Sequence, residues 1–460
     1  MNILLLHIPQ ITEDKKEIMV MPMGVFSIAD YLFQNGYNVE IIHQGIEKII
    51  NPDFDIIRHI ERGKFNVVCV DLHWAKQTRY VLQQLREIKK RLPSLYTVVG
   101  GITATFFAND ILEQTREVDF VIRGEGEYPL LRLLEEIKSG KHRYDSIPNL
   151  TYRFNESIYN NNISFFTDDK FYQKISHSNF SLLRNYSKYL SEFLYADFDT
   201  SKELGIRDSY KNTFYYNPGK GCPYNCIYCG SYFYKKECIG KKKGYFFFDI
   251  NKAVSDIKGA VKYGIDTIRI SFDPDRSRDY YIALFDKIKR YNLRLIYDCF
   301  SLPSVEFIKA VSRSFREDSV LIISVETGEE NVRKKIGRPI FSNRELMECL
   351  AIMNRHRVRA HIFISFGLPY EQKKNFKNAS SLINEVAGLK NVGITVCPMI
   401  FDIGSRMHIS PERFGVIPHI GSFQDLYRLN LSDNRTYYST EYFEEKDILE
   451  HISKLRQLYE

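Results

Sequence analysis

The stretch GKGCPYNCIYCG, from Gly219 to Gly230, holds three of the eight cysteines of this 460-residue chain. Cys222, Cys226 and Cys229 are spaced C-x-x-x-C-x-x-C and flanked by glycines. Three thiolates at this spacing can converge on one metal centre, but a structural zinc site needs a further ligand pair, and no second C-x-x-C follows. Iron–sulfur clusters are normally held by four cysteines, so three leave one iron open to a substrate or cofactor. The sequence therefore predicts a cluster with an open iron, and the alternative is three buried cysteines without a ligand.

The composition is that of a large folded protein. A length of 460 residues with 44% hydrophobic and 14% aromatic residues predicts two or more domains with sizeable cores. A net charge of +7 is mild for this length and gives no argument for a nucleic-acid partner. No apolar run is long enough to span a bilayer, and MNILLLHIPQ has neither a positive n-region nor a cleavage site. The cysteines are too few for a disulfide scaffold, so we expect a cytoplasmic protein with reduced thiols.

Strand and helix patterns alternate over residues 1–140. Apolar runs predict strands at Ile3–Leu6, Val39–Ile42, Val67–Leu72, Tyr96–Val99 and Phe120–Ile122, with helical periods between them. Five such units predict an α/β domain with a doubly wound, Rossmann-like parallel sheet and helices on both faces. Sheets of this type bind ligands at the carboxyl ends of their strands.

The remaining chain divides into three segments. Residues 141–211 are expected to form a connector, in which NLTYRFNESIYNNNISFF predicts a hairpin. Over residues 212–400 the alternation returns with six units, which predict a partial (β/α)6 TIM barrel. The expected barrel strands are Thr213–Asn217, Thr267–Ser271, Arg294–Tyr297, Val320–Val325, Ala360–Ser365 and Gly393–Val396. Residues 401–460 are expected to form a helical tail.

The motif CPYNCIYC resembles the signature of radical S-adenosylmethionine (SAM) enzymes, with the aromatic Tyr228 just before the third cysteine. The resemblance implies that Cys222, Cys226 and Cys229 bind one [4Fe-4S] cluster, whose fourth iron binds SAM. Reductive cleavage of SAM in this family yields a 5′-deoxyadenosyl radical, which removes hydrogen from unactivated carbon.

Three downstream segments resemble the family's SAM-contacting segments in the same order. They are SFDPD (271–275) for the amino group, IISVETGEENVRKKIGR (322–338) for the ribose and carboxylate, and IFISFGLPYE (362–371) for the adenine. The implied SAM contacts are Tyr228, Ser271, Asp273, Ser324, Glu326 and Gly367. The paired glycines usual in the first segment are absent, and Asp273 before Pro274 is equally well explained as a helix cap.

Three stretches of the first domain resemble cobalamin-binding domains, namely VDLHW (70–74), VVGGITAT (98–105) and RGEGEYP (123–129). Val70 stands at the serine of the family's serine-x-leucine motif. Over residues 1–410 the chain therefore resembles cobalamin-dependent radical SAM enzymes. The implied cobalamin contacts are Met21, Gly24, Leu72, His73, Trp74, Gly100, Gly101, Thr103, Gly124 and Glu125.

The segment MVMPMG (19–24) departs from the pattern of cobalamin domains that supply a lower axial histidine. Such domains carry Asp-x-His-x-x-Gly after the first strand, whereas here only Gly24 remains and Met19 and Met21 take the Asp and His places. A thioether is a weak substitute for an imidazole. His73 and Trp74 are expected either near the lower face of the cofactor or as simple core packing.

The resemblance implies methylation of an unactivated carbon in a small-molecule or peptide substrate, through the 5′-deoxyadenosyl radical and methylcobalamin. One alternative keeps the radical chemistry but gives a non-methylating cyclisation, rearrangement or oxidation. A third is a non-catalytic cobalamin and iron–sulfur sensor, against which the intact cysteine motif argues.

The run YKKECIGKKKGY (234–245) carries five lysines just after the cysteine motif. Such a run is commonly a solvated loop. The functional alternative is a docking patch for an acidic electron donor of the flavodoxin or ferredoxin type, which the radical SAM resemblance also implies.

Overall fold

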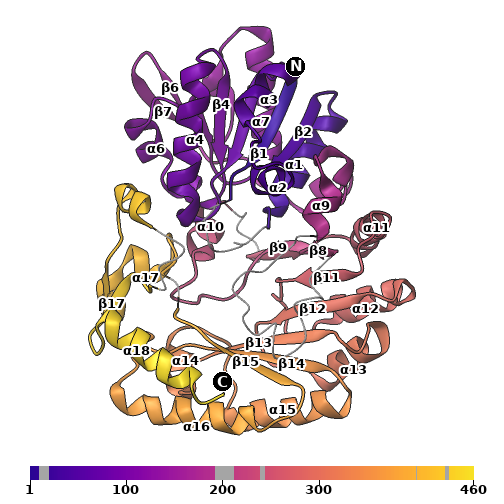
Figure 1. Ribbon diagram of the computed structural model, residues 1–460, viewed down its shortest axis with the longest axis vertical. Helices are drawn as coiled ribbons and strands as arrows, with labels where there is room; N and C mark the ends of the chain where they lie inside the picture. Colours follow the sequence, from indigo (N-terminus) through magenta and orange to yellow (C-terminus); the bar gives the residue numbers. More distant parts are fainter. Residues whose placement is uncertain (10–19, 192–211, 239–243, 400, 430–434, 460) are drawn as a thin grey trace. The chain divides into compact units, whose positions relative to one another are not determined.

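The computed structural model describes residues 1–9, 20–191, 212–238, 244–399, 401–429 and 435–459 (Figure 1). Contacts divide the chain into two compact units. Unit 1 comprises Met1–Ala196, Phe233–Lys242 and Ser422–Asp433, and unit 2 comprises Asp197–Tyr232, Lys243–Gly421 and Asn434–Glu460. The sequence predicts four successive segments, whereas these two units are interleaved along the chain. No helix within the described ranges is long and apolar enough to cross a membrane.

Unit 1 contains the parallel sheet that the sequence predicts. Its strand order begins β2-β1-β3-β4-β5, which is the order of a doubly wound fold, and all four pairings are parallel. The strands are β1 (Asn2–His7), β2 (Asn38–His43), β3 (Val67–Asp71), β4 (Tyr96–Gly100) and β5 (Phe120–Ile122). Each lies within two residues of its predicted bounds, because a strand buried on both faces reads as an uninterrupted apolar run.

The helices of unit 1 also follow the predicted alternation. They are α1 (Met23–Gln34), α3 (Ile56–Gly63), α4 (Thr78–Arg91), α6 (Ala108–Gln114) and α7 (Glu127–Ser139). Two short helices were not predicted, α2 (Gln44–Ile50) and α5 (Ile102–Phe106).

An antiparallel hairpin extends the sheet beyond β5. Strands β6 (Leu150–Phe154) and β7 (Ser157–Asn160) continue the strand order, and they confirm the predicted hairpin. The turn residues Asn155 and Glu156 both have positive φ, as a two-residue hairpin turn requires. The hairpin covers the edge of β5.

Residues 169–191 continue unit 1 through α8 (Asp169–Tyr172) and α9 (Tyr186–Ser191). Buried Asp30 of α1 accepts hydrogen bonds from Ser176 N at 2.7 Å and from Asn179 Nδ2 at 2.9 Å. This end of the expected connector is thus packed against α1.

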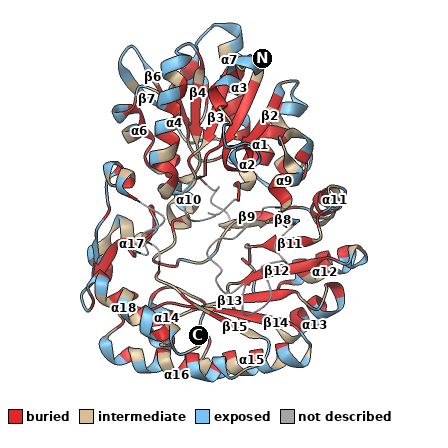
Figure 2. Ribbon diagram, viewed as in Figure 1, coloured by how far each residue is buried: buried red, intermediate tan, exposed pale blue. Residues whose placement is uncertain are grey.

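Unit 2 contains six parallel strands in consecutive order, as a partial barrel requires (Figure 1). They are β8 (Thr213–Tyr215), β11 (Thr267–Ile270), β12 (Arg294–Cys299), β13 (Val320–Glu326), β14 (Arg359–Ile364) and β15 (Val392–Val396). The accompanying helices are α11 (Ile250–Val261), α12 (Asp279–Ile288), α13 (Val305–Ser314), α14 (Glu330–Lys335), α15 (Asn343–Arg355) and α16 (Phe376–Ala387). Figure 2 shows these strands largely buried and the outer faces of the helices exposed. All six predicted barrel strands are confirmed.

The expectation of a helical tail over residues 401–460 is wrong in part. This segment holds α17 (Arg406–Ile409) and α18 (Glu445–Arg456), but also a small antiparallel sheet of β16 (Val416–Pro418) and β17 (Tyr438–Thr440). These strands gave no apolar signal, because Val416–Pro418 ends in a proline and Tyr438–Thr440 is mostly polar.

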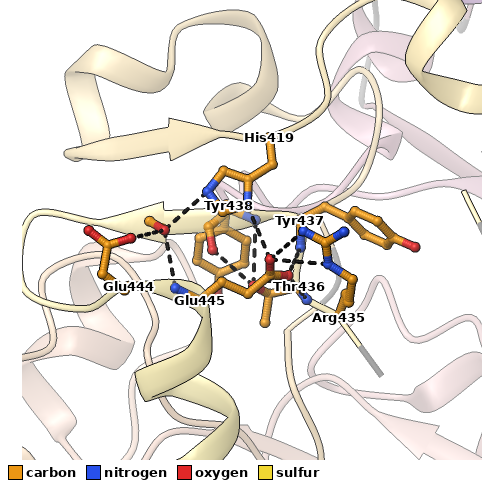
Figure 3. Close-up of polar contacts among 8 residues, drawn as sticks. His419, Arg435, Thr436, Tyr437, Tyr438, Glu444 and Glu445 are labelled. Carbon is orange, nitrogen blue, oxygen red and sulfur yellow. Dashed lines mark hydrogen bonds and ion pairs between the residues drawn. The ribbon is translucent and has the colours of Figure 1, made fainter. Parts of the chain in front are cut away.

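Glu445, in the first turn of α18, holds this C-terminal segment together (Figure 3). Its carboxylate accepts hydrogen bonds from Thr436 N at 2.7 Å, Tyr437 N at 2.8 Å and Arg435 Nη2 at 2.8 Å. Burial alone would raise the pKa of Glu445, but the hydrogen bonds, led by that from Arg435, hold it below its usual value. The contribution of this carboxylate to stability is therefore present above its ordinary pKa and is lost as the pH falls.

His419 joins Glu445 to Ser439, with Nδ1 3.2 Å from the carboxylate and Nε2 3.1 Å from Ser439 Oγ (Figure 3). These contacts run from a carboxylate to a histidine to a serine, as in the catalytic triad of a hydrolase. Ser439 is only 1% exposed, however, and its oxygen accepts the Glu445 N–H at 3.1 Å. The arrangement therefore serves as a structural connection between β16, β17 and α18.

Candidate active site

The cysteine motif forms a loop between β9 (Gly219–Gly221) and α10 (Ser231–Cys238). Strand β9 pairs with β10 (Tyr245–Phe247), and Cys222 N donates to Gly244 O at 2.8 Å. Farther along, Ile227 N donates to Ile336 O at 3.0 Å, and Ile227 O accepts from Met407 N at 2.9 Å. Backbone contacts to three distant segments of unit 2 thus fix the loop without using the thiols.

Two glycines allow the segments of unit 2 to approach this loop. A Cβ at Gly337, which has φ +82°, would lie 2.7 Å from Asn225 O. A Cβ at Gly230 would lie 2.6 Å from Ile403 O. Both distances are shorter than real side-chain contacts, so any larger residue would push the loop out of place.

The three thiols suit a cluster better than a single ion. Cys222 and Cys229 are partly exposed, Cys226 is buried, and none forms a disulfide. No three His, Cys, Asp or Glu side chains within the described ranges converge on one ion. A [4Fe-4S] cluster takes each cysteine at a different iron, so its ligands surround it and need not meet at a point.

Tyr228, Glu326 and Arg338 form a partly buried polar group next to the loop. Tyr228 Oη donates to Glu326 Oε1 at 2.9 Å, and Arg338 Nε lies 3.4 Å from the same oxygen. Burial alone would lower the pKa of Arg338, but Tyr228, Glu326 and Cys226 raise it, so the guanidinium stays charged. Glu326 has φ +68° at a β-bulge where β13 ends, which turns its side chain out of the regular strand direction. Arg338 was not predicted as a site residue.

One face of the barrel sheet is reachable from solvent at its carboxyl-terminal half. Side chains alternate between the two faces of a strand. The partly exposed positions on this face are Tyr215, Ser271, Ser324, Phe363 and Thr395, whereas the alternate positions Ile270, Val325, Ile364 and Val396 are buried. Two of the predicted SAM contacts, Ser271 and Ser324, therefore lie on an accessible face.

Polar groups also lie deeper on this face. Arg269 Nη2 is 2.7 Å from both carboxylate oxygens of Asp298, and His361 Nε2 is 2.9 Å from Thr395 Oγ1. Burial, assisted by the charge of Arg269, lowers the pKa of His361 to about 3, so its imidazole is neutral at neutral pH.

Asp273 and Gly367 are placed differently from the other predicted SAM contacts. Asp273 is fully buried and accepts from Arg278 Nη2 at 2.7 Å, Tyr297 Oη at 2.8 Å and Phe300 N at 2.7 Å. The expectation of a helix cap at Asp273 is wrong, because α12 begins only after Arg278. Through these contacts Asp273 instead anchors the loop after β11. A Cβ at Gly367 would lie 2.4 Å from Ile448 Cγ1, so this glycine is needed for packing against α18.

Glu371 stabilises the turn after β14. It is fully buried, accepts from Gly367 N at 2.7 Å and Leu368 N at 3.0 Å, and contacts Thr327 Oγ1 at the end of β13. Burial raises the pKa of this carboxyl to about 7, although its hydrogen bonds act in the opposite direction. The protonated form is thus favoured in the folded protein relative to the unfolded chain.

We expect Glu371→Gln to stabilise the protein at pH 8. The raised pKa means that the free energy of unfolding falls as the pH rises from the ordinary carboxyl value toward about 7. A glutamine can accept both backbone N–H groups with its oxygen and donate to Thr327 Oγ1 with its amide. The variant should gain on the order of 3 kcal/mol over the wild type at pH 8 and little at pH 4, measured by urea unfolding. An equal difference at both pH values would contradict the prediction.

The predicted cobalamin contacts after β3 and β4 come together in unit 1. Leu72 N donates to Gly100 O at 2.7 Å, and Thr103 Oγ1 donates to His73 O at 2.9 Å. A Cβ at Gly101, which has φ +109°, would lie 2.7 Å from Leu72 O, whereas one at Gly100 would lie 3.6 Å from Ile122 O. Gly101 is therefore needed by its own neighbours, whereas a Cβ at Gly100 would make only an ordinary van der Waals contact.

The loop after β5 is joined to this group through Thr105. Thr105 Oγ1 donates to Gly101 O at 2.7 Å, and Gly124 N donates to Thr105 Oγ1 at 3.0 Å. Glu125 is 3% exposed, and its carboxylate accepts hydrogen bonds from Tyr172 and Tyr234. The carboxylate of Glu125, a predicted cobalamin contact, is thus bound to two tyrosine hydroxyls of the protein.

His73 and Trp74 follow β3 at the ligand-binding edge of the sheet. Their rings lie 4.9 Å apart, and Trp74 is 37% exposed, so it is available to a ligand. Burial lowers the pKa of His73 to about 4, which keeps its imidazole neutral. His7, at the end of β1, lies 2.9 Å from Asp71 Oδ1 and was not predicted as part of this group.

Met21 and Gly24 lie at the start of α1. Met21 is 2% exposed, and its N–H donates to Tyr189 Oη at 3.1 Å. A Cβ added at Gly24 would meet no other atom within 4 Å. Met19 and the three lysines Lys241, Lys242 and Lys243 lie outside the described residues.

Two family models match the chain. Residues 18–134 match the B12 binding domain, and residues 216–383 match the Radical SAM superfamily. The chain carries a B12 binding domain followed by a Radical SAM domain. The cofactors implied by these two domains are cobalamin, SAM and a [4Fe-4S] cluster.

Curated relatives resemble part of this radical SAM protein. Hopanoid C-3 methylase from Methylococcus capsulatus is 28% identical over 149 residues, which is 32% of this chain and 28% of the relative. Anaerobic magnesium-protoporphyrin IX monomethyl ester cyclase from Synechocystis sp. is 23% identical over 138 residues, which is 30% of this chain and 27% of the relative. The matches thus span about a quarter of the length of these relatives.

Solved structures share the two-domain fold. The radical SAM methyltransferase TsrM from Kitasatospora setae has a TM-score of 0.69 at 14% identity, covering 100% of this chain and 89% of its own. The cobalamin-dependent SAM radical enzyme OxsB has a TM-score of 0.69 at 12% identity, covering 98% of this chain and 66% of its own. At these identities the likeness establishes the fold, with an N-terminal B12-binding domain and a C-terminal radical SAM barrel.

Proposed function

We propose that this cobalamin-dependent radical SAM enzyme methylates an unactivated carbon of a small-molecule or peptide substrate. The observation that carries the proposal is the three-cysteine loop, fixed by its own backbone, in a chain that also carries a B12-binding domain. When bound, the three cofactors supply one-electron chemistry and a transferable methyl group.

The residues of unit 2 fit a cluster with SAM beside it. Cys222, Cys226 and Cys229 would hold the cluster. Arg338 offers a fixed positive charge to the SAM carboxylate, and Glu326 offers an acceptor to its hydroxyl or ammonium groups. The accessible face at Ser271 and Ser324 would receive the nucleoside.

The residues of unit 1 fit a corrin at the carboxyl ends of β3 and β4. Gly100 leaves space there, Thr103 fixes the backbone of His73, and the exposed ring of Trp74 offers an apolar wall. Met21 stands at the place where related domains carry a histidine, so it would offer no imidazole to the cobalamin. Gly24, Leu72, Gly101 and Gly124 shape the loops, and an electron donor of the flavodoxin or ferredoxin type would supply the reducing electrons.

A second candidate function is a non-methylating radical reaction. One curated relative is named as a cyclase, so the similarity does not separate ring closure from methylation. Both candidates use the same cofactors and differ in whether a methyl group is consumed.

The deciding measurement is product stoichiometry with methyl-labelled SAM under anaerobic reducing conditions. Methylation consumes two SAM molecules, so we expect equal amounts of S-adenosylhomocysteine and 5′-deoxyadenosine, with the label in the product. Deoxyadenosine formed without homocysteine product or label would replace the methylation proposal by the cyclisation or oxidation candidate.

A further inference from the structure

Residues 336–338 lie directly against the cysteine loop, and both segments belong to unit 2. Ile227 N donates to Ile336 O at 3.0 Å, and the Cys226 thiol donates to Gly337 O at 3.6 Å. A Cβ added at Gly337 would lie 3.3 Å from Cys226 Cα, so the two backbones are in close contact. The backbone contacts that fix the loop therefore also place Arg338 beside the second cysteine of the motif.

The guanidinium of Arg338 lies between this cysteine and strand β13. The Arg338 side chain is 7% exposed, and its Nη2 donates to Ser324 O at 3.0 Å. The guanidinium also lies 5.8 Å from the centre of the Phe300 ring. Burial lowers the pKa of Arg338, but its charged and hydrogen-bonded neighbours, Cys226 among them, raise it. Arg338 is thus a fixed cation in contact with a cysteine of the motif.

Glu326 is the acidic group beside this arginine. Its Oε1 accepts from Tyr228 Oη at 2.9 Å and lies 3.4 Å from Arg338 Nε. The latter pair is not aligned as a hydrogen bond, and Arg338 Nε has no hydrogen-bond partner among the described residues. The arginine and the glutamate therefore act on the nearby cysteine with charges of opposite sign.

The charge next to Cys226 matters for a cluster bound there. As a ligand, the thiol loses the proton that it donates to Gly337 O, so a carbonyl oxygen then faces a negative sulfur. Reduction of the cluster adds one electron and no proton, which increases the negative charge further. Hydrogen bonds to the sulfurs and the local charge are two of the factors that set cluster potentials. A cation at this place therefore favours the reduced cluster.

We propose that Arg338 raises the reduction potential of the cluster held by Cys226 and that Glu326 partly offsets this effect. Arg338 acts through the ligand sulfur, so it is a positioning residue for charge. The single electron comes from a donor of the flavodoxin or ferredoxin type, which is oxidised by one electron. A higher potential allows a weaker donor of this type to reduce the cluster. The inference rests on the proposed function only in its assignment of Cys226 as a cluster ligand.

The experiment measures the midpoint potential of the reconstituted cluster at pH 8 without SAM, by dithionite titration followed by EPR of the reduced cluster. Arg338→Gln should disfavour reduction about tenfold, which lowers the potential of a one-electron couple by about 59 mV. Glu326→Gln should shift the potential in the opposite direction, because it removes the offsetting charge. Arg338→Lys keeps the charge, so its potential should lie closer to that of the wild type than the potential of Arg338→Gln.

Arg294→Gln is the matched control. Arg294 is also a buried arginine paired with a carboxylate, since its Nε donates to Asp318 Oδ2 at 2.7 Å. It is the first residue of β12, whereas Phe300, whose ring lies 6.3 Å from that of Tyr224 in the cysteine loop, follows the other end of this strand. The same loss of charge at this distance should leave the cluster potential unchanged.

An unchanged potential in Arg338→Gln, or shifts of the same sign in Arg338→Gln and Glu326→Gln, would overturn the proposal. If Arg338→Gln takes up no cluster, Glu326→Gln decides, because it alters the same local charge and leaves the arginine in place. A wild type without iron would overturn the ligand assignment and this inference with it. Failure of the methylation proposal would leave the measured potentials untouched, so the two failures are distinguishable.

Discussion

Replacing Cys222, Cys226 and Cys229 together by alanine should abolish cluster binding while leaving the fold intact. The wild type should take up about four iron atoms per chain on anaerobic reconstitution, and the variant essentially none. The fold should persist because backbone hydrogen bonds, such as that from Ile227 N to Ile336 O at 3.0 Å, hold the loop. Iron and sulfide analysis with visible absorbance measures the first effect, and circular dichroism the second.

Cys349→Ala is the matched control for this experiment. Cys349 is buried in α15, where its thiol contacts Pro303 O at 3.8 Å, so its loss should cost some stability but no iron. A triple variant that kept the cluster absorbance, or a control that lost its iron, would disprove the ligand assignment.

Replacing Glu445 by alanine should destabilise the protein by about 3–5 kcal/mol. The change removes the acceptor of Thr436 N, Tyr437 N and Arg435 Nη2, and it leaves two buried backbone donors without a partner. Urea unfolding at pH 7 measures the loss, and limited proteolysis should show early cleavage between β16 and α18.

Glu444→Ala tests whether the effect belongs to this carboxylate in particular. Glu444 is exposed and caps α18, so its removal should cost about 1 kcal/mol or less. Equal losses in the two variants would mean that the contacts drawn in Figure 3 do not set the stability of the segment.

The strands were predictable because their periodicity is local. Buried runs such as Val67–Asp71 and Val320–Glu326 give an unambiguous apolar signal. Because strand and helix patterns alternate along the chain, a parallel arrangement of the strands follows. The two-stranded sheet of β16 and β17 gave no such signal. Its strands, VIP and YST, contain no buried apolar run, and Glu445, which fixes the segment, acts through contacts that no spacing reveals.

The parts of the candidate site that lie in a local sequence motif could be predicted, whereas the parts that depend on contacts between distant residues could not. The cysteines could be read from spacing, whereas the pairing of Arg338 with Glu326 depends on a loop that returns past the end of β13. The basic residue after Gly337 in KKIGR was the available signal. The glycine pair after β4 stays a predicted cobalamin contact, and the structure adds a reason for Gly101 that no spacing reveals, since a Cβ there would lie 2.7 Å from Leu72 O.

The interleaving of the two units has a consequence for synthesis on the ribosome. Unit 1 is completed by η9 (Phe423–Arg428), whose Phe423 ring lies 5.5 Å from that of Phe107. The first half of the chain can therefore collapse early, but its Phe107 surface stays uncovered until nearly the whole polypeptide has been translated. All six barrel strands precede η9 in the chain, so the last contacts of the first unit can form only when translation is nearly finished.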